Sequence, residues 1–513
     1  MSVHGTGRRS ARRRSRPAAP SGPRQPPWRT LRRGMEPVRA VSDDQLEAIH
    51  QASLRLLAET GMDFLHPRAR QMWTDAGATV DGDRVRLDPA LVTSLVEQAP
   101  SRFTMHARNP AHDVEIGGDA VVFSAVASAP YVSDEAAGRR QGNERDFTDL
   151  VRLSQSLNAI HIHGGYPVEP VDIHASVRHL HATRILLTQT DKVVGSYSLG
   201  RERNLDCLEM VRIARQLDDD TLDQEPSIHT VINASSPLRF DHPMLEGILQ
   251  LSARNQVVIL TPFTLAGAMA PVTVAGALAQ QNAEALAGIA FTQLVRPGAP
   301  VVYGGFTSNV DMRSGSPAFG TPEFMKAALI GGQLARRAGV PYRSSNVCTS
   351  NAVDAQSAYE SVFSLWGAVM GGANIVFHGA GWLEGGLRAS YEKMVIDADL
   401  LQMVAAFLEP VVVDDDSLAL AAIAEVGPGG HFFGVQHTQD RFRDAFFSPM
   451  VSDWRNFESW EEAGGPSALD HASRLVGELR DSFEPPPLAP EVAAELNEFV
   501  DRRVAEGGAP TDF

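Results

Sequence analysis

The chain has 513 residues with 46 Lys and Arg against 62 Asp and Glu, a formal net charge of −16. A hydrophobic fraction of 43% is ordinary for a globular protein with a large core. No apolar run approaches the roughly 18 residues of a transmembrane helix. Two cysteines, Cys207 and Cys348, exclude a disulfide framework and a multi-cysteine zinc site. We therefore expect a soluble, cytoplasmic enzyme without a membrane segment.

The N-terminal end has a different charge from the rest of the chain. Residues 1–34 hold ten arginines and no acidic residue, and they lack the apolar stretch of a secretory signal. Folded-looking sequence follows Met35 directly, so we interpret residues 1–34 as a disordered extension from an upstream start of the reading frame. A targeting arm is the alternative. The remaining chain is strongly acidic, which argues against nucleic-acid binding.

The first clear element is a helix that starts after Ser42. Ser42 can cap it, Gln45 stands three residues on, and an apolar face continues until Gly61. Residues 62–118 indicate mixed helices and strands with turns at Asp81-Gly82 and Gly117-Gly118. We therefore predict an N-terminal α/β cap over residues 35–118.

A regular alternation of strands and helices follows. Eight short apolar runs are separated by helix-length, mostly Ala-rich segments; they cover residues 121–123, 160–163, 193–196, 228–232, 257–260, 301–303, 340–343 and 374–378. Eight such units predict a (β/α)₈ TIM barrel over residues 119–388. An open doubly wound sheet is the alternative, but its glycine fingerprint is missing, because Phe432 replaces the last glycine after Gly427-Pro428-Gly429-Gly430. Residues 389–513 are predicted to form a helical C-terminal extension.

Chemistry in a TIM barrel lies at the carboxyl ends of the strands. Those positions hold aromatic, imidazole and amide groups and one guanidinium, without a carboxylate: Tyr131, His163, Tyr197, Asn233, Phe263, Phe306, Arg343 and His378. The strand ends therefore do not provide the pair of carboxylates that glycoside hydrolysis requires. One arginine among polar groups is typical of a site for a small carboxylate, and aromatic rings attract quaternary ammonium groups. Each residue also has a structural alternative, such as a rim ion pair for Arg343 or simple packing for Phe263, Phe306 and Trp382.

Histidines offer an alternative function. His161 and His163 alternate on one strand, as in TIM-barrel metallohydrolases, although the final strand supplies His378 where that class uses Asp. Asp172-Ile173-His174 begins like a corrinoid-binding loop, but Val177 replaces the required glycine. We expect neither a metal nor a corrinoid bound by this chain itself.

Longer motifs carry a family resemblance. They are residues 58–62 (AETGM), 231–238 (VINASSPL), 354–360 (DAQSAYE), 391–393 (YEK) and 427–432 (GPGGHF). From about Met35 onward the chain resembles the trimethylamine methyltransferase family, particularly its members without pyrrolysine, typified by the glycine betaine:corrinoid methyltransferases. The resemblance implies a TIM barrel and transfer of a methyl group from a methylated amine to Co(I) of a separate corrinoid protein.

The resemblance also implies a substrate site. The positions that meet the ligand's carboxylate and ammonium in the betaine-using members match Tyr131, Asn233, Arg343 and His378. Every residue here is a standard one, whereas the trimethylamine enzymes carry pyrrolysine, so glycine betaine is the first choice of substrate. Other betaines remain open, as does a non-catalytic betaine-binding paralogue. We expect Arg343 and His378 to position the substrate, Phe263, Phe306 and Trp382 to form an aromatic cage, and the chain to form a homo-oligomer.

Overall fold

The computed structural model describes residues 25–511. Its central sheet has eight strands in the order β1 (Leu31–Arg32), β7 (Ala120–Ala125), β19 (Ile375–Ala380), β18 (Tyr342–Ser345), β15 (Val301–Gly304), β13 (Val257–Leu260), β11 (Ile228–Ile232) and β10 (Val194–Ser196). All neighbours pair in parallel except β1, which runs antiparallel to β7. Seven of the eight predicted runs are therefore confirmed as parallel strands.

The second predicted run, residues 160–163, is not a regular strand. Only Ile162 bridges in parallel fashion to Ser124 on one side and to Val193 on the other. That residue links the two ends of the parallel sheet, which gives the fold its barrel-like form. A core cluster inside the sheet includes Val122, Ile162, Val257, Ile259 and Phe377, and it also takes in side chains of the hairpin β5 (Arg102–Met105) and β6 (Val114–Gly117).

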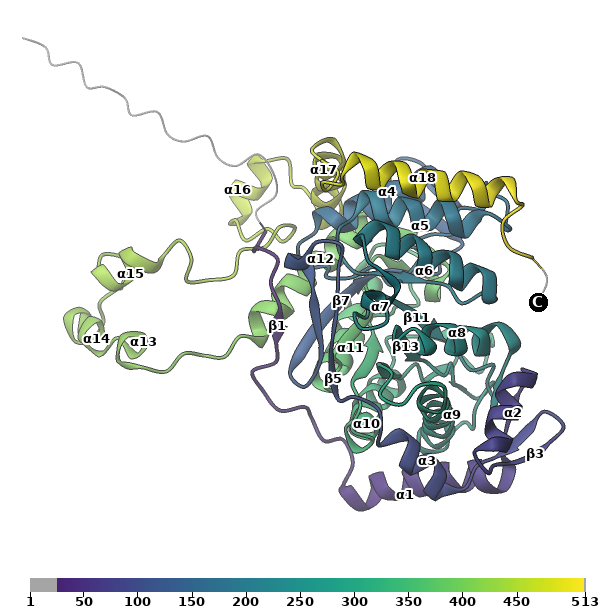
Figure 1. The fold of residues 1–513 in the computed structure, drawn as a ribbon. Helices are drawn as coiled ribbons and strands as arrows, with labels where there is room; N and C mark the ends of the chain where they lie inside the picture. Colours follow the sequence, from purple (N-terminus) through teal and green to yellow (C-terminus); the bar gives the residue numbers. More distant parts are fainter. Residues whose placement is uncertain (1–24, 512–513) are drawn as a thin grey trace, which may run out of the picture.

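Helices connect successive strands and cover the outside of the sheet (Figure 1). They are α4 (Glu144–Ser156), α5 (Arg178–Gln189), α6 (Arg201–Arg215), α8 (His242–Ala253), α9 (Val274–Val295), α10 (Pro322–Arg337), α11 (Ala355–Met370) and α12 (Tyr391–Leu408). The sheet strands are almost wholly buried, as expected when helices pack on one face and side chains fill the other. No described helix is long and apolar enough to cross a lipid bilayer.

Loops beyond the carboxyl ends of the strands form two small sheets. One joins β20 (Trp382–Leu383), β21 (Arg388–Ser390), β8 (Tyr131–Asp134) and β9 (Gly138–Gln141). The other joins β14 (Leu265–Ala266), β16 (Ser308–Val310) and β17 (Pro317–Ala318). Because both grow from loops at one end of the parallel strands, they build walls above that end.

The N-terminal region contains the mixed elements that the sequence predicts. Helix α1 (Asp43–Arg55) starts with the expected capping box between Ser42 and Gln45, and Gly61, with φ of 77°, ends the chain's helical path. The other elements are β2 (Met62–Phe64), α2 (Pro67–Asp75), β3 (Thr79–Asp81), β4 (Arg84–Arg86) and α3 (Pro89–Val96), with β12 (Arg239–Phe240) paired to β2. Helices α1 and α3 pack against α9, on the side of the sheet.

The predicted disordered extension over residues 1–34 is wrong for residues 25–34. Strand β1 pairs with β7, and the Trp28 ring packs against His112 and His161 with centroid distances of 5.0 and 5.7 Å. A tryptophan in a proline-flanked segment thus covers apolar surface near the start of the sheet. Residues 1–24 of that prediction lie outside the described residues.

The C-terminal extension is helical but partly detached from the body. After α12, residues 409–449 project away as an arm with α13 (Asp415–Leu418), α14 (Leu420–Val426) and α15 (Gln436–Arg441) (Figure 1). The chain returns where the Asp399 carboxylate accepts hydrogen bonds from the Met450 and Val451 amides, at 2.7 and 3.2 Å. Then α16 (Phe457–Glu462) follows, α17 (Ala468–Asp481) packs on α12 and α4, and α18 (Pro490–Ala505) packs on α5 and α6.

Candidate active site

A cavity of about 430 Å³ opens at the carboxyl ends of the parallel strands. Its volume lies in the range of small-molecule sites. Described residues that line it are mostly apolar and aromatic and include neither an acidic residue nor a lysine; among them are Ser128, Tyr197, Asn233, Thr261, Phe263, Phe306, Phe319, Arg343, Phe377, His378, Trp382 and Leu387. Of the seven predicted site residues, six come together here: Asn233, Phe263, Phe306, Arg343, His378 and Trp382.

Arg343 is a buried cation without a counter-ion among the described residues. It lies in β18 and is only 2% exposed. Its guanidinium lies over the rings of Phe306 and Phe377, 5.1 and 4.8 Å from their centroids. One long bond of 3.5 Å reaches the Gly305 carbonyl, while its Nε has no partner. Burial lowers the pKa of Arg343 to about 9. An unpaired buried cation of this kind calls for an anion from outside the protein.

His378 faces Arg343 from the neighbouring strand. It lies in β19 at a break in register between Val376 and Ala380, with φ of 55°, and such a bulge re-aims a side chain. Its Nδ1 accepts a hydrogen bond from the Ala127 amide at 3.3 Å. Burial, together with Arg343, holds the pKa of His378 well below its usual value, so the ring is neutral and its proton is on Nε2.

Two donors therefore point at the same space. His378 Nε2 lies 3.4 Å from Arg343 Nη2, and because both nitrogens carry hydrogen, neither can accept from the other. A shared acceptor between them would satisfy both groups. A carboxylate has the charge to pair with Arg343 and the two oxygens to accept from both residues.

Aromatic rings enclose the rest of the cavity. Phe306 is central, with ring-centroid distances of 5.2 Å to Phe263, 5.6 Å to Phe319 and 6.3 Å to Trp382. The Trp382 ring is also 4.2 Å from His378, and its Nε1 donates to the Cys348 carbonyl at 3.1 Å. The polar edge of the indole is thus used by the protein, which leaves an apolar and electron-rich surface towards the ligand space.

Asn233 and Tyr131 differ in their relation to the cavity. Asn233 lies just after β11, is exposed, lines the cavity and makes no hydrogen bond to other described residues, so its amide is available to a ligand. Tyr131 is not among the lining residues; its ring lies under the guanidinium of Arg139, 3.6 Å from the centroid. The structure therefore does not bring Tyr131 together with the other predicted residues.

A different tyrosine lines the cavity. The Tyr197 hydroxyl donates to Ser128 Oγ at 2.7 Å, and burial raises the pKa of Tyr197. The position of Tyr197 at a predicted strand end was the feature of the sequence that indicated a place for it at the site. Phe319, in contrast, comes from the small sheet beyond β15, and nothing in its local sequence indicated a place at the site.

The histidine pair considered for a metal does not form a site. His161 Nδ1 accepts from the Phe123 amide at 3.1 Å, and its Nε2 lies 3.1 Å from the Arg29 carbonyl, so both nitrogens have backbone partners. Burial lowers the pKa values of His161 and His163 to about 3. The two rings belong to no metal-competent cluster among the described residues. The hydrolase alternative therefore has no geometric support.

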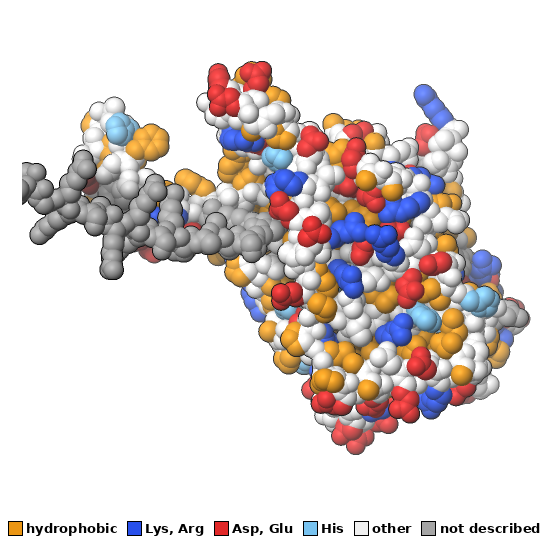
Figure 2. Space-filling view, turned by 90° about the horizontal axis from the view of Figure 1, so that it is seen from above, with side chains coloured by type: hydrophobic (Ala, Val, Ile, Leu, Met, Phe, Trp, Pro, Cys, Tyr) orange, Lys and Arg blue, Asp and Glu red, His pale blue; other side chains and the backbone are white. Residues whose placement is uncertain are grey.

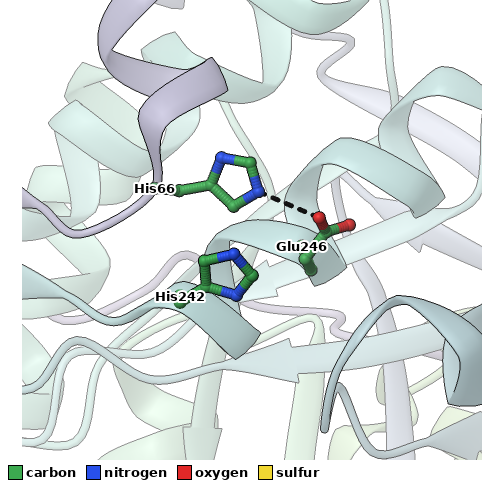
Figure 3. Close-up of side chains that lie close together, drawn as sticks. All are labelled: His66, His242 and Glu246. Atoms are coloured by element: carbon green, nitrogen blue, oxygen red, sulfur yellow. Dashed lines mark hydrogen bonds and ion pairs between the residues drawn. The ribbon is translucent and has the colours of Figure 1, made fainter. Parts of the chain in front are cut away.

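One other cluster of possible ligands, His66, His242 and Glu246, lies between the N-terminal region and α8 (Figure 3). His66 Nε2 lies 2.9 Å from Glu246 Oε1, while its Nδ1 accepts from the Arg68 amide and so caps α2. That cap places the proton on Nε2, where a metal would need a lone pair. The rings of His66 and His242 are stacked at 4.4 Å, so their in-plane lone pairs run side by side. We interpret this cluster as a tie between α2 and α8.

Comparison with known proteins identifies the family. The model of the trimethylamine methyltransferase family matches residues 6–508. The chain belongs to the trimethylamine methyltransferase family. Its membership, predicted from the sequence motifs, is confirmed, and this family member is a methyltransferase.

Individual relatives cover nearly the whole chain. It is 34% identical over 469 residues to glycine betaine methyltransferase of Desulfitobacterium hafniense strain Y51, covering 91% of this chain and 98% of that protein. It is 28% identical over 473 residues to trimethylamine methyltransferase MttB of Desulfitobacterium hafniense strain DSM 10664 / DCB-2, with 91% and 94% covered. A solved structure of the hydroxylamine MtmB complex is similar in fold, with a TM-score of 0.51 at 11% identity over 90% of this chain and 88% of that one.

Proposed function

We propose that this methyltransferase takes a methyl group from a quaternary amine that carries a carboxylate, with glycine betaine as the first choice. One observation carries the proposal: Arg343 is buried without a counter-ion in the described part of the chain, and its Nη2 faces the Nε2–H of His378 at 3.4 Å. Protonated trimethylamine would bring a second cation to this arginine, and neither form of trimethylamine offers the two acceptor oxygens that would pair both donors. The 34% identity to a glycine betaine methyltransferase supports the same choice.

The ligand's two ends match the two parts of the cavity. The carboxylate lies between Arg343 and His378 at the buried end. The trimethylammonium group then lies among Phe263, Phe306 and Trp382, whose faces stabilise a cation by about 0.5–2 kcal/mol per well-placed ring. Asn233 donates its amide N–H to an oxygen of the same carboxylate, the only hydrogen-bond acceptor of glycine betaine, and so fixes the rotation of the substrate.

The chemistry needs little acid–base help from this chain. Co(I) of a separate corrinoid protein supplies the nucleophile that accepts the methyl group. The carbon–nitrogen bond breaks with its electron pair on nitrogen, so the leaving group is a neutral tertiary amine that requires no proton. A cavity without acids or lysines suits such a step. The residues act by holding one N-methyl group in line towards the open side of the cavity, and such positioning can supply several kcal/mol.

We also interpret the sheet as a closed (β/α)₈ barrel in which the second strand is reduced to Ile162. In that interpretation a corrinoid protein reaches the substrate through the cavity mouth, which is walled by the small sheets after β7, β13, β15 and β19. Because Asp172-Ile173-His174 lacks the glycine of a corrinoid loop, the corrinoid belongs to the partner.

The test is a methyl-transfer assay. Purified protein is mixed with chemically reduced cob(I)alamin, or with a cognate corrinoid protein, and each of glycine betaine, carnitine, γ-butyrobetaine and trimethylamine. Loss of Co(I) absorbance and appearance of the demethylated amine should occur with glycine betaine and not with trimethylamine. Betaine binding by calorimetry without any transfer would instead indicate the non-catalytic paralogue, and transfer from trimethylamine alone would overturn the assignment of the carboxylate.

A further inference from the structure

The arm, residues 409–449, exposes an unusual amount of apolar surface. Ten of the 24 large hydrophobic side chains that are exposed among the described residues lie in these 41 residues: Val411, Val412, Val413, Leu418, Leu420, Ile423, Phe432, Phe433, Phe442 and Phe446. Phe433 and Phe446 are 82% and 84% exposed. Figure 2 shows hydrophobic side chains on the projecting arm, away from the mixed charges of the body.

The arm has too little structure of its own to hold this shape in water. Its helices have four, seven and six residues, well below the length at which isolated helices are stable. Only Ala422 and Val435 are buried within it. Around α15 the arm has an open hollow of about 440 Å³, whose lining includes Phe433, Phe442 and Phe446. An extended arm of this kind requires another surface to pack against.

A second exposed apolar surface lies at the base of the arm. Helix α11 presents Tyr359, Val362 and Phe363, and α12 presents Met403 and Phe407, each 37–63% exposed. The two helix faces join where the rings of Trp366 and Phe407 meet at 4.8 Å. We call these residues the α11/α12 patch. Since α12 ends at Leu408, the patch and the arm begin at the same point of the fold.

Within one chain the two surfaces do not meet, because the arm projects away from the body (Figure 1). We propose that the arm of one copy lies on the α11/α12 patch of a second copy, which returns its own arm in the same way. A two-fold axis near the end of α12 pairs each arm with the other chain's patch, as an isologous interface requires. Every copy of the chain carries both halves of such a contact.

The exposed area fits a second copy, and the charge of the arm disfavours two other classes of occupant. The arm's four exposed phenylalanines leave about 500 Å² accessible at roughly 200 Å² per ring, and its six exposed aliphatic side chains bring the arm close to the about 800 Å² that each partner of a stable interface contributes. The arm holds seven acidic residues and two arginines. A net charge of −5 disfavours an anionic lipid surface or a nucleic acid as the occupant.

The test is sedimentation velocity of the full chain, whose monomer mass is 55.4 kDa. Wild type should sediment at twice that mass or a multiple of it. An arm variant, Phe433→Asp with Phe446→Asp, and a patch variant, Tyr359→Asp with Phe363→Asp, should each dissociate at least tenfold more readily. Val272→Asp, at an equally exposed apolar position on neither surface, is the matched control. Circular dichroism checks that each variant is folded.

Mixing distinguishes an arm-to-patch contact from other contacts. The arm variant keeps a wild-type patch, and the patch variant keeps a wild-type arm, so an equimolar mixture of the two should regain dimers held by one intact contact. A monomeric wild type, or a wild-type oligomer that either variant leaves unchanged, overturns the proposal. So does a wild type that gains mass only when a corrinoid protein is added, because that result assigns the arm to the corrinoid protein.

Discussion

Replacing Arg343 by methionine should have opposite effects on stability and on binding. In the free protein the guanidinium is a buried cation whose folded-state pKa, about 9, lies below its ordinary value of 12.5. At about 1.4 kcal/mol per pH unit this is on the order of 5 kcal/mol of lost solvation. The cost is present below pH 9, where Arg343 is charged, and it is relieved as the pH rises above 9.

Methionine removes that cost and forfeits the contacts with Phe306 and Phe377, each worth about 1 kcal/mol. The net gain of about 2–3 kcal/mol corresponds to a rise in Tm of about 2–3 °C for a chain of this length. Betaine at 100 times its Kd should raise the Tm of the wild type by a similar amount, since such a concentration stabilises by about 2.7 kcal/mol. It should not raise the Tm of Arg343→Met, because losing the partner of a buried charge costs about 3 kcal/mol or more.

The assay is thermal denaturation at pH 7 with and without glycine betaine, together with calorimetric titration. Arg503→Met is the matched control, since Arg503 pairs with Asp206 through bonds of 2.7 and 3.2 Å and its loss should lower Tm without affecting betaine binding. If Arg343→Met lowers Tm as the control does, Arg343 has a partner that offsets its burial. If the variant binds betaine with an unchanged Kd, Arg343 does not hold the carboxylate.

Other predictions concern the same cavity. The Kd for betaine should stay constant from pH 6.5 to 8.5, because Arg343 is charged and His378 is neutral throughout that range, and it should rise about tenfold per pH unit above pH 9. Titration calorimetry at a series of pH values checks this dependence. A rise in Kd that begins near pH 7 would mean that another group controls binding. Trp382→Ala should raise Kd about 3- to 30-fold through loss of a cation–π face, whereas Trp366→Ala should not, and equal effects would remove Trp382 from the cage. Tyr131→Ala should change Kd less than twofold in the same titration, since Tyr131 does not line the cavity; a tenfold rise would restore the role that the family resemblance implies.

The spacing of the apolar runs made most of the parallel sheet predictable from the sequence. Fully buried parallel strands appear as continuous apolar runs, and seven of the eight runs form strands. The second run, His161 and Ile162 included, has the same composition but only one bridging residue, although the amides of His161 and His163 bond to the carbonyls of Phe123 and Val193 on its two sides. Pattern alone cannot show that. The order of residues 25–34 was not predicted, because the arginines and prolines of this segment outnumber its apolar contact residues Trp28 and Leu31.

The site was predictable where it depends on strand ends. Asn233 follows β11, and Arg343 and His378 lie within β18 and β19, two residues before each strand ends, so the parallel sheet brings all three towards one end. Tyr131 follows the first strand too, but it lies on a hairpin that turns its ring towards Arg139. Neither the bulge that aims His378 nor the packing of Phe319 could be predicted, because both depend on contacts between segments distant in sequence.

The role of Arg343 and His378 as the carboxylate site is tested most simply by comparing glycine betaine with choline as methyl donors to cob(I)alamin. The two molecules share the trimethylammonium group and differ in the carboxylate that Arg343 and His378 are proposed to hold. We expect kcat/KM for glycine betaine to exceed that for choline by about 10- to 150-fold, as for loss of a hydrogen bond to a charged group of about 1.5–3 kcal/mol. Equal rates with the two donors would contradict it.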